Sequence, residues 1–360
     1  MRASILKRAE PTLRALLRSN CQTGAHDWLS CTGSLPENSV PSPVFSVMIS
    51  MRAGLAPAVL SEHVHGCTCK SDFGSLTGYA LANHLPACGV HGLCNYAHDA
   101  AVSVIFDAAR SLGERPSKEV TGLFAASDAR PDLLLPYLGA DAGVRGRGRA
   151  PTPRIAGMRL IADVKTISPI CASQIERSAS VALSAAVAAE REKINKYAAR
   201  VNQQGAEFLG LGFETTGAFG PGVLKLIERL SARADERGAQ SLDADACTWT
   251  ARRWSTRFRQ LLSLSVVAGA ARAVIEGAHR LHDHMRPPPP PDPNPGWAAH
   301  LPAGGSLLLE AIRLGSLPQA GAHVAHAGGG PPVTAQQPLA VDDGGAAAGD
   351  GRRVRFAAGV

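Results

Sequence analysis

Two aspartates and a lysine have the side-chain chemistry and spacing to act together on a phosphate ester. Asp132 precedes the apolar run 133–135, and Asp163 follows the apolar run 160–162. Each run reads as a buried strand, and neighbouring strand ends would let the two carboxylates share Mg²⁺, which prefers oxygen ligands and keeps several waters. Lys165 lies two residues beyond Asp163, so it points to the same face of a strand and can position a water or offset charge on a phosphate. The pattern predicts a metal-dependent nuclease-type site, and the alternative is two ordinary strands with charged ends.

A second group of residues has the composition of a zinc site. Its four predicted ligands are Cys67, Cys69, His84 and Cys88. The first two are close enough to bind one ion from a loop, and the last two lie one helical turn apart. Three sulfurs and one nitrogen suit a tetrahedral structural Zn²⁺ site. His91 and Cys94 are spare candidates, and the alternative is a loop that merely contains cysteines.

Basic residues accompany the predicted carboxylates and favour contact with a phosphate backbone. Arg145, Arg147 and Arg149 alternate with glycine in a segment between the two aspartates that has no apolar periodicity. Lys193 and Lys196 lie one turn apart on the helix predicted after the second aspartate. Both groups could grip phosphates electrostatically, and the alternatives are an unstructured insert and a solvated helix face.

The elements that must position these residues follow from hydrophobic periodicity and from turn residues. In chain order we expect helices at 1–20, 43–55 and 96–112, strands at 118–124, around 133–135 and around 160–162, a helix at 178–204, a strand at 206–216, and helices from Pro221 and over 248–281. The helix 178–204 is expected to bury a stripe of Ile194, Tyr197, Ala198 and Val201. The fold class is therefore α/β, with a mixed sheet flanked by helices.

Length and composition set the limits on this organisation. The chain has 360 residues, which allows one large domain or two, and 45 % hydrophobic residues provide a real core. The formal charge of +7 and a pI near 9.1 favour an acidic partner such as nucleic acid. Clustered cysteines and histidines without an apolar signal stretch predict a reduced, metal-binding protein that is not secreted. No run looks long and apolar enough to span a bilayer, so no membrane partner is expected.

Composition also divides the chain into five expected segments. They are a helical and irregular segment at 1–60, the zinc knuckle at 61–95, the catalytic domain at 96–240, a helical extension at 241–283, and a disordered tail at 284–360 rich in proline, glycine and alanine.

The order helix, strand, strand, strand, helix, strand, helix resembles the restriction-endonuclease-like, or PD-(D/E)xK, fold. Pro131-Asp132 and Asp163-Val164-Lys165 are similar to the two signature pieces of that superfamily. The resemblance implies a Mg²⁺-dependent phosphodiesterase in which the acids bind the metal and Lys165 lies near the attacking water. Lys193 and Lys196 resemble the basic residues that are often found on the second helix of that superfamily.

A wider set of motifs resembles the carboxy-terminal region of retrotransposon-derived reverse transcriptase open reading frames, in which a Cys/His knuckle precedes an endonuclease-like domain. The matching pieces are Ala25-His-Asp-Trp-Leu29, Cys67-x-Cys69, Ala82-Asn-His84 with Cys88, His98-Asp-Ala-Ala101, Arg130-Pro-Asp132, Ala162-Asp-Val164, Lys196-Tyr-Ala198, Phe213 to Pro221, and Arg253-Trp254 through Arg272. The resemblance implies DNA, more than RNA, as partner and a nuclear or cytoplasmic location.

The chain departs from this pattern in three ways. It has no segment like the polymerase, the interval from Asp132 to Asp163 is long, and Lys165 stands where members of the pattern often lack a lysine. The main functional expectation is a metal-dependent DNA endonuclease-type module. The alternative is a catalytically inactive nucleic-acid-binding relic with the same fold, and the oligomeric state stays open.

Overall fold

The computed structural model describes residues 10–31, 39–60, 67, 69, 78–89, 92–119, 121, 130–136, 138, 159–242, 248 and 250–285. The chain divides into two compact units, Met1–Pro288 and Pro289–Val360, and every described residue belongs to the first. The predicted phosphate contacts of Arg145, Arg147 and Arg149 and the predicted disordered tail lie outside the described residues, except that 284 and 285 end a helix.

A four-stranded mixed sheet forms the centre of the described unit, which confirms the α/β class. Its order is β1 (Ser117–Lys118), β2 (Leu133–Leu135), β3 (Leu160–Ile167) and β4 (Glu207–Glu214). The first two pairings are antiparallel, and β3 pairs with β4 in parallel. The described part of the predicted strand 118–124 is much shorter than expected, since only its first residue belongs to β1.

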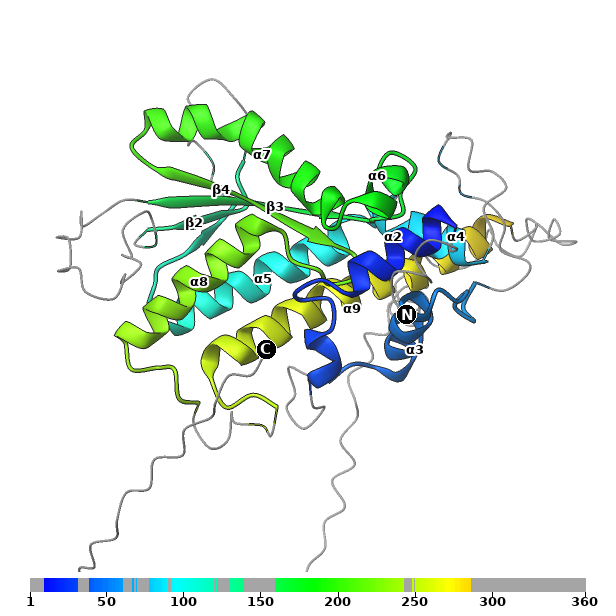
Figure 1. Cartoon of the computed structure of the whole chain (residues 1–360), viewed down its shortest axis with the longest axis horizontal. Coiled ribbons are helices and arrows are strands. Elements are labelled where there is room, and N and C mark those ends of the chain that lie inside the picture. The colour runs from blue at the N-terminus through cyan, green and yellow to red at the C-terminus, as the bar shows by residue number, and fades with distance from the viewer. Residues whose placement is uncertain are drawn as a thin grey trace, which may run out of the picture. The chain divides into compact units, whose positions relative to one another are not determined.

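Helices cover both faces of the sheet (Figure 1). α7 (Ser184–Gln203) lies on one face, where Tyr197 and Val201 pack with Ile161 of β3. On the other face, α5 (Asn95–Ser111), α8 (Pro221–Glu236) and the first half of α9 (Trp254–Met285) enclose the larger core with Ala162 and Val164. Alternation along β3 therefore assigns odd-numbered residues, including Asp163 and Lys165, to the α7 face.

A second core joins the N-terminal helices to the later half of α9. It involves η1 (Asp27–Ser30), α3 (Ser42–Ala53), α4 (Gly78–His84) and η3 (Leu85–Ala87). α2 (Pro11–Asn20) instead packs on α6 (Ile175–Ser180), where the guanidinium of Arg18 donates to the carbonyl of Ala179 at 2.8 Å. These contacts place the Cys/His region and the sheet in one compact unit.

The helix predicted over 178–204 is two helices. α6 ends at Ser180, and Leu183 adopts a left-handed conformation with φ of 57° before α7 begins at Ser184. A non-glycine residue in that conformation cannot continue a right-handed helix, so the chain changes direction there. Ile194 was predicted to be buried but is 44 % exposed, because the buried stripe of α7 is turned toward Tyr197 and Val201.

The expectation that no run is long and apolar enough to span a bilayer was wrong for the helix α9. Its segment Trp254–His282 is long enough to cross a bilayer and contains a window with a mean hydropathy of 1.5. Most of that window, 72 %, is buried against other parts of the protein. The helix packs closely on α5, because a Cβ at Gly269 would lie 2.5 Å from the Cα of Ala97.

Candidate functional site

The structure brings Asp132 and Asp163 to neighbouring positions, as the sequence predicted. Leu133 pairs with Ala162 across β2 and β3, so the next position outward places Asp132 opposite Asp163. The prediction that both residues end their strands is wrong for Asp163, which lies inside β3. The strand continues because its parallel pairing with β4 extends to Ile167.

Asp163 is a buried carboxylate with a partly buried cationic partner. Its side chain is only 2 % exposed, and its Oδ1 forms an ion pair with the Nζ of Lys193 on α7. Burial and then the charge of Asp132 raise the pKa of Asp163, while Lys193 and His98 act in the opposite direction. The two aspartates lie close together, because Asp132 also accepts a hydrogen bond from the backbone N–H of Val164, the residue after Asp163.

Asp132 is held by a histidine from α5 and by the sheet itself. The Nε2 of His98 lies 3.0 Å from its Oδ2, and the backbone N–H of Val164 donates to the same oxygen at 2.6 Å. Burial by itself would lower the pKa of His98, but Asp132 and then Asp99 raise it to about 9. In the sequence, His98 stands out only as the first residue of the motif His98-Asp-Ala-Ala101. Its pairing with Asp132 depends on how α5 crosses the sheet, which no local spacing reveals.

The two lysines near the carboxylates have partners that the sequence did not predict. Lys165 shares the face of Asp163, but its Nζ pairs with Glu192 of α7. Lys193, predicted to bind nucleic acid, instead neutralises Asp163. Lys196 stays exposed, and its Nζ lies 4.8 Å from the ring centroid of Tyr197. The site therefore contains two carboxylates facing several cationic groups.

Glycines explain why α7 approaches the sheet closely enough for these pairs. A Cβ at Gly212 would lie 2.3 Å from the carbonyl oxygen of Ala186, and one at Gly210 would lie 2.7 Å from that of Glu190. The carboxylate of Glu190 accepts hydrogen bonds from the N–H groups of Gly212 at 3.2 Å and Gly222 at 2.8 Å. Burial raises the pKa of Glu190 to about 7, and the backbone donors partly offset this.

The four predicted zinc ligands come together in space. The ligand atoms of Cys67, Cys69, His84 and Cys88 all lie within 4.8 Å of one another, so the group could hold a metal ion. The Sγ of Cys69 is 3.2 Å from the Nε2 of His84, and the Sγ atoms of Cys67 and Cys88 are 3.7 Å apart. His84 ends α4 and Cys88 follows η3, so one continuous α-helical turn does not join them as predicted. Cys94 lies outside the group, and His91 is not among the described residues.

The two aspartates form a smaller donor set. Among the residues that the structure describes, the Cys/His group is the one cluster in which three or more His, Cys, Asp or Glu side chains lie close enough to share a metal ion. Mg²⁺ is commonly held by one or two carboxylates together with waters and substrate phosphates, so Asp132 and Asp163 have suitable chemistry. A cation at Asp163 would compete with the ammonium of Lys193.

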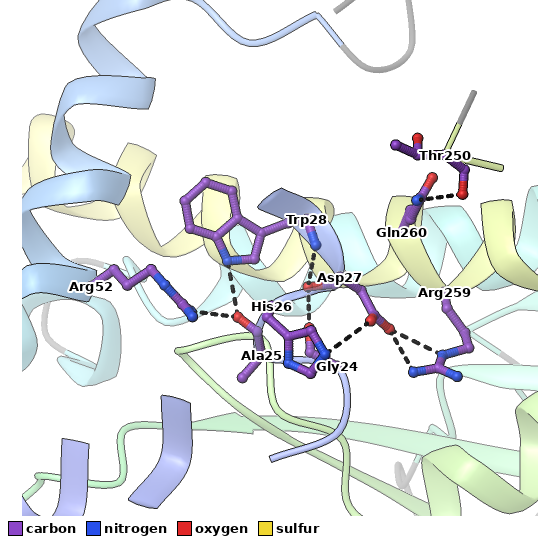
Figure 2. A network of polar contacts seen from close by, with 10 residues as sticks. Gly24, Ala25, His26, Asp27, Trp28, Arg52, Thr250, Arg259 and Gln260 are labelled. Carbon is purple, nitrogen blue, oxygen red and sulfur yellow. Dashed lines mark hydrogen bonds and ion pairs between the residues drawn. The ribbon is translucent and has the colours of Figure 1, made fainter. Parts of the chain in front are cut away.

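The motif at residues 25–29 serves packing rather than chemistry (Figure 2). The indole N–H of Trp28 and the guanidinium of Arg52 both donate to the carbonyl of Ala25, at 3.1 and 2.6 Å. Asp27 pairs with Arg259 of α9 at 2.9 Å, beside a pocket of about 350 Å³. These contacts fasten the N-terminal turn to α9 and leave the main charges of the pocket already paired.

No protein-family model matches this chain. A search of curated proteins likewise returns no relative. The site must therefore be interpreted from its own geometry.

Proposed function

We propose that this chain is a metal-dependent nuclease module that hydrolyses phosphodiester bonds at Asp132 and Asp163. The observation that supports it most is the strand register that sets these two carboxylates opposite each other on adjacent strands, with Lys193 paired to Asp163 and His98 paired to Asp132. Paired acids at a basic surface are the arrangement that phosphate chemistry with a divalent cation requires.

Each residue has a specific part in the proposed reaction. Asp132 and Asp163 would hold Mg²⁺, which when bound would stabilise negative charge on the phosphate oxygens. Lys193 keeps the buried carboxylate of Asp163 paired until a cation and substrate arrive. Lys165 would orient the attacking water after exchanging its contact with Glu192. The water oxygen forms a bond to phosphorus, the bond to the leaving sugar oxygen breaks, and a proton passes to that oxygen.

A second candidate function is nucleic-acid binding without cleavage. It is favoured by the ion pairs of both lysines, because Lys165 already contacts Glu192 and Lys193 already contacts Asp163. The same fold and the same basic surface would then serve only to hold a strand. The order of motifs resembles that of retrotransposon-derived reading frames, and this resemblance is consistent with either function, with DNA as the partner in the nucleus or cytoplasm.

We also propose that the Cys/His group binds Zn²⁺ as a structural ion. Three sulfurs and one nitrogen fill a tetrahedral set and leave no open position for chemistry. The ion would fix the region between α3 and α5 against α9.

Plasmid nicking separates the two candidate functions. Purified full-length protein should relax supercoiled DNA with Mg²⁺, and Asp163→Asn should lower the rate by at least about 100-fold, as loss of a transition-state contact does. The matched control is Asp107→Asn, which removes an exposed carboxylate from α5. Equal nicking by wild type and Asp163→Asn would contradict the nuclease. Tight DNA binding without nicking by any protein would instead establish the binding module.

A further inference from the structure

A basic pocket lies between α6 and α7, next to the candidate site. Its volume is about 320 Å³. Its lining residues come from both helices and are Arg177, Val187, Ala188, Arg191, Glu192 and Asn195. Figure 1 shows α6 beside the start of α7. The helix α7 also carries Lys193, which pairs with Asp163. None of the pocket's arginines was part of the sequence prediction.

The charges in this pocket are unbalanced. Glu192 is its only acidic lining residue, and the carboxylate of Glu192 pairs with Lys165. Arg177 and Arg191 are both exposed, and neither forms an ion pair with any residue that the structure describes. Two guanidinium groups therefore face the pocket without a neutralising partner from the described chain.

The pocket and the two aspartates are physically connected. Glu192 forms part of the pocket wall and contacts Lys165, which shares one face of β3 with Asp163. The next residue of α7, Lys193, pairs with Asp163 directly. Three consecutive residues of α7 thus join the pocket to the candidate site: Arg191, Glu192 and Lys193.

We propose that Arg177 and Arg191 bind a backbone phosphate of the strand whose neighbouring phosphodiester lies at Asp132 and Asp163. This inference rests on the proposed function and adds a second phosphate position to it. The guanidinium fork matches two phosphate oxygens at once, and two unpaired forks lining one pocket suit a doubly contacted anion. Asn195 lies one turn after Arg191 on the same face of α7 and supplies a further hydrogen-bonding group.

The partner is a nucleic-acid strand because the pocket adjoins Asp132 and Asp163, where the proposed function places a phosphodiester. A polymer with regularly repeated phosphates can occupy the pocket and the candidate site together. Its recognition is electrostatic and independent of sequence, because each bound phosphate releases counterions. DNA and RNA share this chemistry, so the experiment must compare both.

Fluorescence anisotropy without added Mg²⁺ tests the proposal separately from cleavage. Labelled double-stranded DNA, single-stranded DNA and single-stranded RNA are titrated with full-length protein over a range of KCl concentrations. The test variant is Arg177→Gln with Arg191→Gln. The matched control is Arg110→Gln with Arg115→Gln, which removes the same charge at the end of α5 and beyond it.

The test variant should weaken binding roughly tenfold and reduce the salt slope by about 1 to 2, as loss of one or two phosphate contacts predicts. The control should stay within about twofold of wild type. Arg177→Lys with Arg191→Lys, which keeps the charge without the fork, should recover most of the salt slope but only part of the affinity. Because no Mg²⁺ is added, this assay measures binding without cleavage, so it can succeed even if the nuclease proposal fails.

Equal weakening by the test and control variants would overturn the proposal. So would the absence of salt-dependent binding by the wild type, or equal competition by polyglutamate and by DNA of the same total charge. Circular dichroism should show the same helical content in all the arginine variants, because the four substituted arginines are exposed.

Discussion

The ammonium of Lys193 lies on the carboxylate of Asp163, and α7 and β3 together shield this pair from water. The carboxylate is nearly inaccessible, whereas the lysine keeps 19 % of its side chain exposed. A cation is therefore already built into the place where the sequence predicted a metal. The pair stabilises the contact between α7 and β3. A metal ion that binds Asp163 must displace the ammonium of Lys193.

Lys193→Met should show what this pair contributes. It leaves a buried carboxylate without its cation, so the free energy of unfolding should fall by about 3 kcal/mol at neutral pH. The cost should grow as the pH rises, because Lys193 is one of the groups that lowers the pKa of Asp163. Urea denaturation measures the change. Millimolar Mg²⁺ should restore more stability to the variant than to the wild type if the carboxylates accept a divalent cation.

The control for that experiment is Lys225→Met. Lys225 is half exposed, and its partner Glu207 also pairs with Arg229, so the loss should stay below about 1 kcal/mol. A similar cost for both variants would show that the pair at Asp163 has no special importance.

Gly212→Ala should disturb the contact between α7 and β4. The new Cβ would lie 2.3 Å from the carbonyl oxygen of Ala186, which belongs to a helix backbone and cannot move alone. We expect a loss of about 2 kcal/mol or more in the free energy of unfolding, typical of overpacking. Gly89→Ala is the matched control, because a Cβ at Gly89 meets nothing within 4 Å. Equal thermal stability of the two variants would contradict the proposed close packing.

Glu190→Gln should remove a pH dependence of stability. Burial raises the pKa of Glu190 from 4.5 to about 7, so the folded state holds a proton that the unfolded state releases between these values. Stability from this group is therefore complete below pH 4.5 and is lost as the pH rises to about 7. The difference in unfolding free energy between wild type and Glu190→Gln should fall by about 3 kcal/mol over that range.

Urea denaturation at several pH values measures this difference. The glutamine keeps an oxygen to accept from the N–H groups of Gly212 and Gly222. Glu228→Gln, which removes an exposed carboxylate from α8, controls for the change in net charge. A difference that stays constant with pH would show that folding does not raise the pKa of Glu190.

Zinc removal should destabilise the region that joins α3 to α5. Burial raises the pKa of Cys67 to about 12, so without a cation this group is held as a thiol, whereas a bound metal requires the thiolate. Protein expressed with zinc should contain about one ion per chain. Cys69→Ser should lose that ion together with roughly 3 kcal/mol of stability or more. Elemental analysis and thermal denaturation measure both quantities.

Cys94→Ser supplies the comparison, because Cys94 lies in the same part of the chain but outside the cluster. It should retain the ion and its melting temperature. Loss of zinc from Cys94→Ser, or none from Cys69→Ser, would show that the ligand set is wrong.

Several elements were predictable because their signals are local. The run Leu133–Leu135 is apolar on both faces and forms β2, and the apolar run at Leu160 starts β3. Gly220-Pro221 starts α8 where the sequence places it, because proline is tolerated in the first turn of a helix. The break at Leu183 was missed, since no glycine or proline marks it and a leucine adopts the left-handed conformation.

Sequence alone determined which groups are available: two aspartates on apolar strands, a set of Cys and His ligands, and basic residues along one helix. Hydrophobic periodicity and ligand type are properties of short segments, so they can be read directly from the chain. Only the tertiary structure decided that Lys193 rather than Lys165 meets Asp163, and that His98 meets Asp132. Those pairings depend on the rotation and approach of α7 and α5 against the sheet, which are set by contacts such as Gly212 with Ala186 between distant parts of the sequence.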